Sequence, residues 1–499
     1  MQMWSVVRSR QANVQPLQDY FPGEEEATSR FSPVPEGFGK LWTGAEDYVE
    51  PPKATDREGI KTSFYCHTRI NSVSKDTTRD PSPAVVTAAV ERIAFIYGYA
   101  GQKVRNRDPV DPRTVNHLSS LEKFSEFIST TVDGRHILDP LSCPGNPWMS
   151  YGNNNAKVFG YIPELGYVGD NVSLLYLAVR NRFDELSVKK CCDPIMLFIK
   201  QEPHTKKKAQ EGRWRLISAV GATDQLVAEI LFRPLMNYMM LLGYTFSAPM
   251  GWSPAQEGGI PFFHGVTRGK TQAADRSAWD WTLQKWEAMM MKQLLVLLTP
   301  FEERFVANHV LAMLGPKVFV TNGFEYKHTD YSMVSGWKLT INVNTIWQHL
   351  EHAVVKIMRS IENLPSHRNV QQACFEVDIG ELPTAMGDDT IQRPESKEYW
   401  DTYATFGTKI KEVIDDTKEF CGYNFTMNSY HPVYTAKHAY ALSHIKENVV
   451  VETLVSYQYV YAFEDERLEF IQRWLRLLGA GESVVDKRVL RDKPRGLPY

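Results

Sequence analysis

The sequence predicts an α+β protein of two or three subdomains, and three observations support this prediction. The chain has 499 residues, which is more than one ordinary hydrophobic core needs. Its apolar fraction of 43% and charged fraction of 23% are normal for a folded protein. Apolar residues recur at helical spacing over 222–242 and 282–299, whereas short strand-like runs adjoin Asp275 and Asp388.

The individual elements are assigned in chain order. Residues 1–60 are loop-rich, and we expect them to wrap another part of the protein because their aromatic side chains need burial. These aromatic residues are Trp4, Phe21, Phe31, Phe38 and Trp42. The elements expected further along are a helix over 84–99, a turn-dense loop over 142–155, helices over 222–242, 282–299, 335–361, 396–420 and 464–479, and a basic tail.

The composition limits how the protein could meet nucleic acid or a membrane. The formal net charge is −3, so nucleic acid would need a local basic channel. The six cysteines are scattered without zinc-type pairing, which favours reduced thiols in a cytosolic protein. No run of 18 apolar residues and no signal-peptide core occurs, so no transmembrane segment is predicted. Any membrane association would have to come through partners or a surface helix.

The most informative stretch is Gly387-Asp388-Asp389, which has apolar residues on both sides. Two adjacent carboxylates on a tight turn can hold divalent cations, and a pair of such cations is the usual device for in-line phosphoryl transfer. Gly and Asp are also common in turns for conformational reasons alone. The tripeptide therefore needs support from other motifs.

A first supporting motif is the stretch from Asp275 to Trp281. A short strand ending at Asp275 and a helix beginning near Thr282 fit this stretch. Asp275 would then lie at the carboxyl end of the strand, where a metal ligand is well placed. Asp280 would lie near the helix start, and taken alone it is better explained as a helix cap.

A second supporting motif runs from Ser335 to Asn344. Ser335 can begin a helix, and Gly336, Thr340 and Asn344 are four residues apart, so they would share one helical face. A small, polar face of this kind makes a groove that can meet a sugar and a base. An ordinary capped helix with buried polar residues explains the same pattern, and both interpretations stay open.

A third supporting motif is basic. Residues 200–215 contain six basic and two acidic residues, hence a net charge of +4. Arg213 and Arg215 alternate around Trp214 as on a strand, so both guanidinium groups would point to one side. The planar fork of arginine suits a triphosphate. The run 206–208, taken alone, is better explained as a solvated basic loop.

Together these motifs resemble a known family. Asp-x4-Asp, Ser-Gly-x3-Thr-x3-Asn and Gly-Asp-Asp follow one another over residues 275–389, as in the palm of viral RNA-dependent RNA polymerases. The basic segment lies upstream, where that family keeps its nucleotide-entry loop. Residues 198–204 (Phe-Ile-Lys-Gln-Glu-Pro-His) and 275–281 are most similar to the polymerases of plant sobemoviruses and their relatives.

The resemblance implies a right-hand polymerase with fingers, palm and thumb, whose palm is a small antiparallel sheet backed by helices. Asp388 and Asp389 would occupy the turn of a central hairpin that faces Asp275, and an N-terminal segment would bridge fingers and thumb. The expected boundaries are 1–225 for the N-terminal segment and fingers, 226–284 for the first part of the palm, 285–330 for a fingers insertion, 331–445 for the second part of the palm, and 446–499 for the thumb and basic tail.

The resemblance also implies a two-metal site. Asp275 and Asp388 would bind two magnesium ions, for which manganese can substitute, and Asp389 would support a second or third ligand position. Asp275, Asp388 and Asp389 would thus be the catalytic and metal-binding residues of a nucleotidyl transfer from NTPs to an RNA 3′ end. Positive charge around the transferring phosphoryl group would provide the main catalytic effect.

Other residues receive substrate-binding roles from the same resemblance. Asp280 and Asn344, with Ser335 and Thr340 near them, would recognise the ribose 2′-hydroxyl, which distinguishes RNA from DNA. The incoming triphosphate would be neutralised by Lys200, Arg213 and Arg215. The template-entrance loop would contain Ser142, Gly145 and Pro147.

One position departs from the family pattern. Many relatives place a lysine just after the segment that matches 422–427, where it is proposed to protonate the pyrophosphate. Here the residues that follow offer no lysine before Lys437. We therefore expect His431 or Lys437 to be this general acid, although His431 is equally well explained as a turn residue.

The expected partners are template and nascent RNA, NTPs, a genome-linked viral protein as primer and other viral replication proteins. The expected location is the host cytoplasm, in membrane-associated replication complexes reached through partners. Two other interpretations remain. The first is a reverse transcriptase, but that class usually places a bulky side chain against the 2′ position, so Asp280 and Asn344 disfavour it. The second is a catalytically silent RNA-binding scaffold, which leaves the three carboxylates unexplained.

Overall fold

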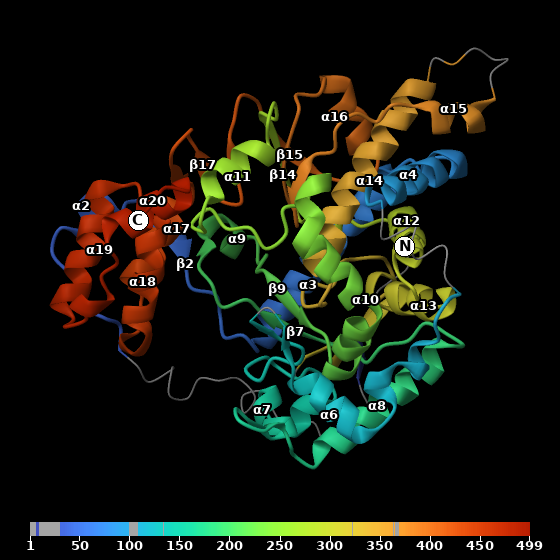
Figure 1. The fold of residues 1–499 in the computed structure, drawn as a ribbon, viewed down its shortest axis with the longest axis horizontal. Coiled ribbons are helices and arrows are strands. Elements are labelled where there is room, and N and C mark those ends of the chain that lie inside the picture. Colours follow the sequence, from blue (N-terminus) through green and yellow to red (C-terminus); the bar gives the residue numbers. More distant parts are fainter. Residues whose placement is uncertain are drawn as a thin grey trace.

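The protein mixes helices with several small sheets, which confirms the predicted α+β class (Figure 1). The computed structural model describes residues 6–8, 30–98, 108–132, 134–321, 323–362, 364 and 369–499. Two of the predicted buried aromatic residues, Trp4 and Phe21, lie outside the described residues.

A four-stranded antiparallel sheet carries the predicted catalytic carboxylates. Its strands, in spatial order, are β13 (Thr384–Met386), β14 (Asp389–Gln392), β10 (Gln272–Arg276) and β15 (Ile410–Ile414). Ala274, Ala385 and Ile391 are buried on the strands, whereas Asp275 and Asp388 are exposed. On β10 the exposure of Asp275 between buried Ala274 and Arg276 follows from the two-residue period of a strand, whereas Asp388 is exposed because it lies in the turn between β13 and β14.

A five-stranded sheet joins segments that are far apart in the sequence. Its order is β1 (Val6–Arg8), β12 (Phe324–His328), β11 (Lys317–Thr321), β7 (Ile195–Ile199) and β9 (Leu216–Ala219). Strands β11 and β7 are parallel, and the other neighbours are antiparallel. Strand β9 begins directly after Arg215, so this sheet anchors the basic segment.

The smaller sheets are hairpins and short ladders. A three-stranded sheet has the order β16 (Glu419–Phe420), β17 (Tyr423–Phe425) and β18 (Tyr430–Pro432). The two-stranded pairs are β2 (Tyr48–Val49) with β8 (His204–Thr205), β3 (Thr131–Val132) with β4 (Arg135–His136), and β5 (Tyr161–Ile162) with β6 (Gly166–Tyr167).

Helices cover these sheets and contribute most of the core. In chain order they are α2 (Phe38–Leu41), α3 (Arg57–Thr77), α4 (Pro83–Ile96), α6 (Leu121–Ser129), α7 (Asn155–Phe159), α8 (Asn171–Leu186), α9 (Lys206–Gln210), α10 (Ala222–Leu242), α11 (Gly259–Val266), α12 (Lys285–Leu298), α13 (Glu303–Leu314), α14 (Thr340–Ile361), α15 (Val370–Glu376), α16 (Lys397–Ala404), α17 (Thr435–Ser443), α18 (Val450–Val460), α19 (Asp465–Leu477) and α20 (Lys487–Arg495). One large apolar cluster extends from Ile60 to Phe406, and a second one is formed mainly by the C-terminal helices. Helix α14 packs against β13 and α16, so helices back the four-stranded sheet.

The segment from Ser32 to Val49 packs on the C-terminal helices, as its aromatic residues predict. Trp42 is buried and stacks on Phe38, and both rings contact Phe470 of α19. Helix α2 lies beside α19 in Figure 1. The segment then reaches β8 through the β2–β8 pair, so it connects the C-terminal helices with the region around the five-stranded sheet. Phe31 is the exception among the described aromatic residues, because it is half exposed.

Four helices agree closely with the sequence predictions. Helices α4, α10, α12 and α19 match the ranges predicted as 84–99, 222–242, 282–299 and 464–479. The turn-dense loop over 142–155 is confirmed, with one short 3-10 turn at Trp148–Ser150. One described helical stretch, Ala222–Phe246, is long and apolar enough to cross a membrane, but much of it is buried in the core.

The helix predicted over 335–361 begins later than expected, because α14 starts at Thr340. Ser335 does not begin it. The Ser335 backbone and side chain instead form hydrogen bonds with Ser218 on β9. A Cβ atom on Gly336 would collide with the Ser218 carbonyl oxygen, so Gly336 permits a close backbone contact and lies outside the predicted helical face.

The helix predicted over 396–420 is wrong beyond its first half. Helix α16 ends at Ala404, and Gly407 follows with φ of 93°, a conformation that stops a helix. Residues 410–414 then form the edge strand β15, which pairs with β10. The predicted basic tail is also partly a helix, α20, whose Lys487 and Arg491 pair with carboxylates of α19.

Candidate active site

A cavity of about 820 Å³ brings together residues from all the predicted motifs of the core. Its wall includes the β13–β14 turn, the end of β10, the start of α14 and the segment that precedes β9. Among the lining residues are Asp275, Asp280, Ser335, Thr340, Asn344, Asp388, Lys200, Arg213 and Arg215. The members of this group come from residues 200–388, and the fold gathers them in one place.

The β13–β14 turn presents Asp388 at the cavity. Met386 pairs with Asp389, so the two-residue hairpin turn consists of Gly387 and Asp388, and Asp389, which was also predicted in the turn, is the first residue of β14. Gly387 has φ of 69°, a conformation in which glycine carries no Cβ penalty. The Gly387 N–H donates to Thr345 Oγ1 at 2.9 Å, and Gln348 Nε2 donates to the Asp388 carbonyl at 3.1 Å. Helix α14 therefore holds the turn from behind.

Asp275 lies on the strand next to this hairpin. Strands β10 and β14 pair Ala273 with Ile391, and continuing the antiparallel register by two residues places Asp275 opposite Asp389. The Asp275 carboxylate also accepts from the ammonium group of Lys411, which lies on β15. This partner was not predicted, because residue 411 was assigned to a helix. The register pairs Asp275 with Glu412 and Arg276 with Ile410, so Lys411 is an extra residue at a local irregularity, and simple strand alternation would not have revealed its contact with Asp275.

Asp389 lies in a negative environment. Removal of water from the carboxyl group and the charges of Asp388 and Asp275 raise its pKa to about 7, although the Cys421 thiol donates a hydrogen bond to it. Such accumulated negative charge is what a divalent cation relieves, and carboxylate oxygens are the ligands that magnesium and manganese prefer. The donor set therefore fits a hard divalent cation.

The carboxylates do not form a closed metal cluster as they stand. Within the described ranges, no group of three or more His, Cys, Asp or Glu side chains has the arrangement needed to hold an ion. In addition, the Lys411 ammonium group neutralises Asp275, one of the three carboxylates. Binding of a cation would require Asp275 to exchange this partner.

Asp280 and Asn344 form a pair inside the cavity. Asn344 Nδ2 donates to Asp280 Oδ1 at 3.1 Å, and Asn344 Oδ1 is buried with no hydrogen-bond partner among the described residues. Burial and the charge of Asp388 raise the pKa of Asp280 to about 6, against the lowering effect of the Asn344 hydrogen bond. Helix α12 is capped by Gln284 and Glu287, so Asp280 is not its cap.

Aromatic stacking fixes the backbone on both sides of this pair. Trp279, which precedes Asp280, stacks on Trp347 of α14 with ring centroids 3.6 Å apart. Both rings are buried. Because Trp347 is three residues beyond Asn344, the stack brings one turn of α14 against the residues around Asp280.

Ser335 and Thr340 line the cavity, but their hydroxyl groups are engaged in the loop before α14. Ser335 Oγ lies 3.0 Å from Ser218 Oγ. Thr340 Oγ1 lies 2.7 Å from the carbonyl oxygens of both Val334 and Trp337, and its single proton is shared between these two acceptors. These side chains therefore shape the loop that surrounds Asn344.

The basic residues meet the cavity as predicted, although Arg213 and Arg215 precede the strand instead of lying on it. Arg213 pairs with Glu211, while Arg215 and Lys200 both pair with Glu202. Four further basic lining residues that were not predicted as site residues join them: His67, Lys208, Arg276 and Lys338. Lys208 belongs to the run that the sequence alone explained as a solvated loop.

The predicted template loop does not line the cavity, because Ser142, Gly145 and Pro147 are not among its lining residues. Ser142 Oγ donates to Asp139 Oδ2 at 2.6 Å. A Cβ on Gly145 would lie 2.7 Å from Gly221 Cα, so the loop packs tightly against the start of α10. The Asn146–Pro147 peptide bond is cis.

The two predicted general acids lie apart from the carboxylates. His431 Nε2 bonds with Ser429 Oγ at 2.9 Å, and its Nδ1 lies 3.6 Å from Glu464. Lys437 Nζ contacts Glu202 Oε2 at 3.1 Å, beside the basic residues. Neither side chain lines the cavity.

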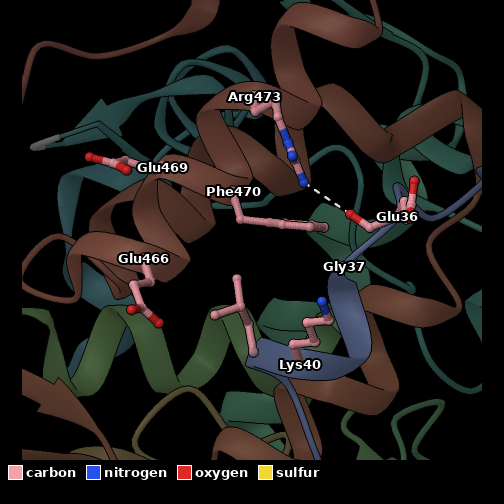
Figure 2. A pocket seen from close by; sticks show the side chains of 8 residues that line it. Glu36, Gly37, Lys40, Glu466, Glu469, Phe470 and Arg473 are labelled. Carbon is pink, nitrogen blue, oxygen red and sulfur yellow. Dashed lines mark hydrogen bonds between the residues drawn. The ribbon is translucent and has the colours of Figure 1, made fainter.

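A second hollow of about 680 Å³ separates the N-terminal segment from α19 (Figure 2). Its lining mixes the carboxylates of Glu36, Glu466 and Glu469 with Lys40 and Arg473. Arg473 Nη2 crosses it to donate to the Glu36 carbonyl at 3.0 Å. This hollow marks the packing of the N-terminal segment and contains none of the predicted catalytic residues.

Comparison with known proteins identifies the family to which the sequence belongs. A family model described as viral RNA-dependent RNA polymerase matches residues 164–431, which is more than half of the chain. The chain therefore belongs to the viral RNA-dependent RNA polymerase family.

Individual relatives are similar over shorter stretches. A replicase polyprotein P2AB of Cocksfoot mottle virus is 28% identical over 216 residues, or 42% of this chain and 21% of the relative. The replicase polyprotein P2AB of Southern bean mosaic virus is 30% identical over 209 residues, or 40% and 19%. An RNA-directed RNA polymerase of Mushroom bacilliform virus is 30% identical over 158 residues, or 29% and 37%. The matched part of the chain thus spans well under half of each of these relatives.

Proposed function

We propose that this protein synthesises RNA on an RNA template by transferring nucleoside monophosphates from NTPs to an RNA 3′ end, and so replicates and transcribes a positive-strand viral genome. The observation that supports this most directly is the single cavity in which the Asp275 and Asp388 carboxylates, the Asp280–Asn344 pair and the Lys200, Arg213 and Arg215 cations meet. Nucleotidyl transfer needs metal-binding carboxylates, sugar-binding polar groups and phosphate-binding cations within the length of one nucleotide.

The carboxylates would serve as the metal-binding part of the site. Asp275 and Asp388 would hold two magnesium ions, or manganese in their place, and Asp389 would assist them. When bound, such ions activate the primer 3′-hydroxyl and neutralise the leaving pyrophosphate. Gly387 and Thr345 keep Asp388 at the turn, and Lys411 keeps Asp275 neutralised until then.

The remaining residues would orient the nucleotide. Arg213, Arg215 and Lys200 would hold the triphosphate, since guanidinium groups bind phosphate through two parallel hydrogen bonds. A ribose 2′-hydroxyl placed near Asn344 could bond with its unpartnered Oδ1 and with Asp280. Ser335 and Thr340 would act by holding the loop that positions Asn344.

A right-hand layout accounts for the arrangement of the sheets. The four-stranded sheet would be the palm, the five-stranded sheet with residues 285–330 part of the fingers, and the C-terminal helices the thumb. Residues 30–49 would bridge fingers and thumb, as the β2–β8 pair and the Trp42 contacts support. The loop with Ser142, Gly145 and Pro147 would guide the template.

Several features of the biological setting are proposed on family grounds. We propose a genome-linked viral protein as the primer, with other viral replication proteins as partners in membrane-associated complexes of the host cytoplasm. The general acid for pyrophosphate remains a prediction for His431 or Lys437. A His431→Gln variant with an unchanged rate and pH profile would remove His431.

Primer extension on a defined RNA template tests the proposed function. The wild-type protein should extend RNA with NTPs in magnesium or manganese, and Asp388→Ala should lose essentially all synthesis while it still binds RNA. Full activity of Asp388→Ala would refute the assignment. Equal use of dNTPs would favour a reverse transcriptase, and RNA binding without any synthesis by the wild type would favour a silent scaffold.

A further inference from the structure

Glu202 is the shared partner of three cations from two parts of the fold. Its Oε1 accepts from Arg215 Nη1 at 2.8 Å, while its Oε2 lies 3.2 Å from Lys200 Nζ and 3.1 Å from Lys437 Nζ. The Glu202 side chain is only 18% exposed, so solvent screens these contacts weakly. Two of the cations, Lys200 and Arg215, line the candidate active site, whereas Lys437 does not.

Lys437 reaches Glu202 from a separate element. It lies in α17, which packs against β2 and the preceding turn at Ala45–Asp47. The contact is close, since a Cβ on Gly44 would lie 2.8 Å from Ala436 Cβ. Strand β2 in turn pairs with β8, which begins two residues after Glu202. Helix α17 and the Glu202 loop are thus held against the same short strand.

The loop that carries Glu202 is itself tied to Arg215. His204 Nδ1 bonds with the Glu202 carbonyl at 2.8 Å, and His204 Nε2 accepts from the Arg215 N–H at 2.9 Å. The side chains and backbones of Glu202 and Arg215 therefore stay together. If Glu202 loses one of its cationic partners, its attraction for the remaining ones increases, and this changes how firmly it holds the Arg215 guanidinium group.

We propose that Lys437 is a positioning residue for nucleotide binding, which acts through Glu202 to leave Arg215 and Lys200 available to a triphosphate. This inference rests on the proposed function. Lys437 supplies part of the positive charge that Glu202 requires, from outside the cavity. Without it, Glu202 is neutralised by Lys200 and Arg215 alone and holds both more firmly.

The physical basis is competition between two anions for the same cations. A triphosphate that enters the cavity must draw Arg215 and Lys200 from Glu202, and each charge-assisted hydrogen bond has to be exchanged. Lys437 remains on Glu202 during this exchange and prevents a buried, unpaired carboxylate from being left behind. The nearby charges of Arg215, Lys437 and Lys200 also hold the pKa of Glu202 at about 2, against the opposing effect of burial, so Glu202 stays ionised.

A double-mutant cycle separates this role from a direct one. Lys437→Met should raise the KM for NTP roughly tenfold, with kcat changed less than about twofold, because substrate capture is affected and chemistry is not. In a Glu202→Gln background the same Lys437→Met change should alter KM by less than about twofold, since the carboxylate through which Lys437 acts is gone. Lys437→Arg should restore the wild-type KM.

Two results would overturn the proposal. An equal rise in KM in both backgrounds would mean that Lys437 acts on the nucleotide without Glu202. A fall in kcat that is independent of Glu202, with a displaced pH profile, would instead support the general-acid role. Lys397→Met is the matched control, because the Lys397–Asp401 ion pair is exposed and lies outside the cavity.

Equilibrium binding keeps this test distinct from that of the proposed function. Binding of an NTP analogue with a non-cleavable α–β bridge to the full chain should weaken in Lys437→Met and recover in Lys437→Arg. A wild-type protein that binds the analogue but extends no RNA would refute the proposed function and leave the coupling measurable. Unchanged analogue binding in Lys437→Met, in a protein that does extend RNA, would refute the positioning role alone.

Discussion

Asn344 Nδ2 donates a hydrogen bond to Asp280 Oδ1 over 3.1 Å, and this contact joins the start of α14 to the turn that follows β10. The donated bond leaves Asn344 Oδ1 as a buried acceptor with no described partner. Such an acceptor costs free energy unless a ligand supplies a donor. The pair therefore presents an unpartnered acceptor in the cavity that also contains Asp388, and the proposed ligand for it is a sugar hydroxyl group.

Removal of the Asp280 carboxylate should weaken discrimination between ribose and deoxyribose. In Asp280→Ala we expect the ratio of kcat/KM for GTP to that for dGTP to fall about 10- to 100-fold, which corresponds to one or two lost hydrogen bonds to a sugar hydroxyl. Single-nucleotide extension with each substrate measures this ratio. A fall in both efficiencies at an unchanged ratio would place the role of Asp280 in folding or metal binding.

The same carboxylate should make stability depend on pH in a defined direction. The pKa of Asp280 is about 6 in the folded protein and near 3.8 when unfolded, so between these values the folded state binds more protons. The stability that the protonated Asp280 carboxyl group contributes is fully present below pH 3.8 and is lost as the pH rises through about 6. Asp280→Asn should therefore be no more stable than wild type at pH 4 and more stable at pH 7.5.

The size of this pH effect has an upper limit of about 3 kcal/mol, since one pKa unit corresponds to about 1.36 kcal/mol. Urea unfolding of both proteins at the two pH values, without divalent cations, measures it. A stability difference that does not change with pH would contradict the prediction.

Substitution of Gly387 should act through backbone conformation and not through crowding. The nearest side-chain atom to a Cβ at this position is Ile341 Cγ1 at 3.9 Å, so there is room, but φ is 69°. Gly387→Ala should cost about 1–2 kcal/mol of stability and lower kcat by more than about tenfold, because the turn shifts Asp388.

Gly387→Asn should keep more activity than Gly387→Ala, because asparagine tolerates the left-handed conformation better than alanine. Single-turnover extension rates and thermal unfolding of the two variants measure both effects. Equal activity of the Ala, Asn and wild-type proteins would show that the turn is not strained.

Lys411 should compete with divalent cations for Asp275. The ion pair is partly exposed, with side-chain exposures of 62% and 48%, so its strength is expected to be about 0.2–1 kcal/mol. Lys411→Met should therefore bind Mn²⁺ up to about fivefold more tightly than wild type. Titration of Mn²⁺ followed by electron paramagnetic resonance measures the affinity, with the exposed neighbour Lys409→Met as control. Weaker binding in Lys411→Met would exclude the competition.

Much of the candidate site could be predicted because its signals are local. The turn at Gly387 follows from the conformational freedom of glycine, and the helices that were predicted correctly have apolar faces that recur within a few residues. The order of the motifs then indicated that Asp275 and Asp388 meet. Their register, one strand beside the other, follows from the structure alone.

The features that sequence patterns missed depend on long-range contacts. Residues 410–414 carry apolar positions that suit a helix or a strand, and only pairing with β10 makes them a strand that brings Lys411 to Asp275. The loop at Ser335 stays non-helical because Ser218, on another sheet, occupies its hydrogen-bonding groups. Neither partner is adjacent in the sequence, so no window of residues could reveal it.

The packing of Trp42 against Phe470 has a consequence for how the chain matures. The two rings are separated by more than 400 residues, so the Trp42 end of the N-terminal segment has no partner ring until α19 has left the ribosome, although β2 can already pair with β8. Contacts of such high sequence separation form late and slowly. A nascent chain can therefore complete its four-stranded sheet while Phe38 and Trp42 are still undocked, and the fold is finished only after the C-terminal helices have been synthesised.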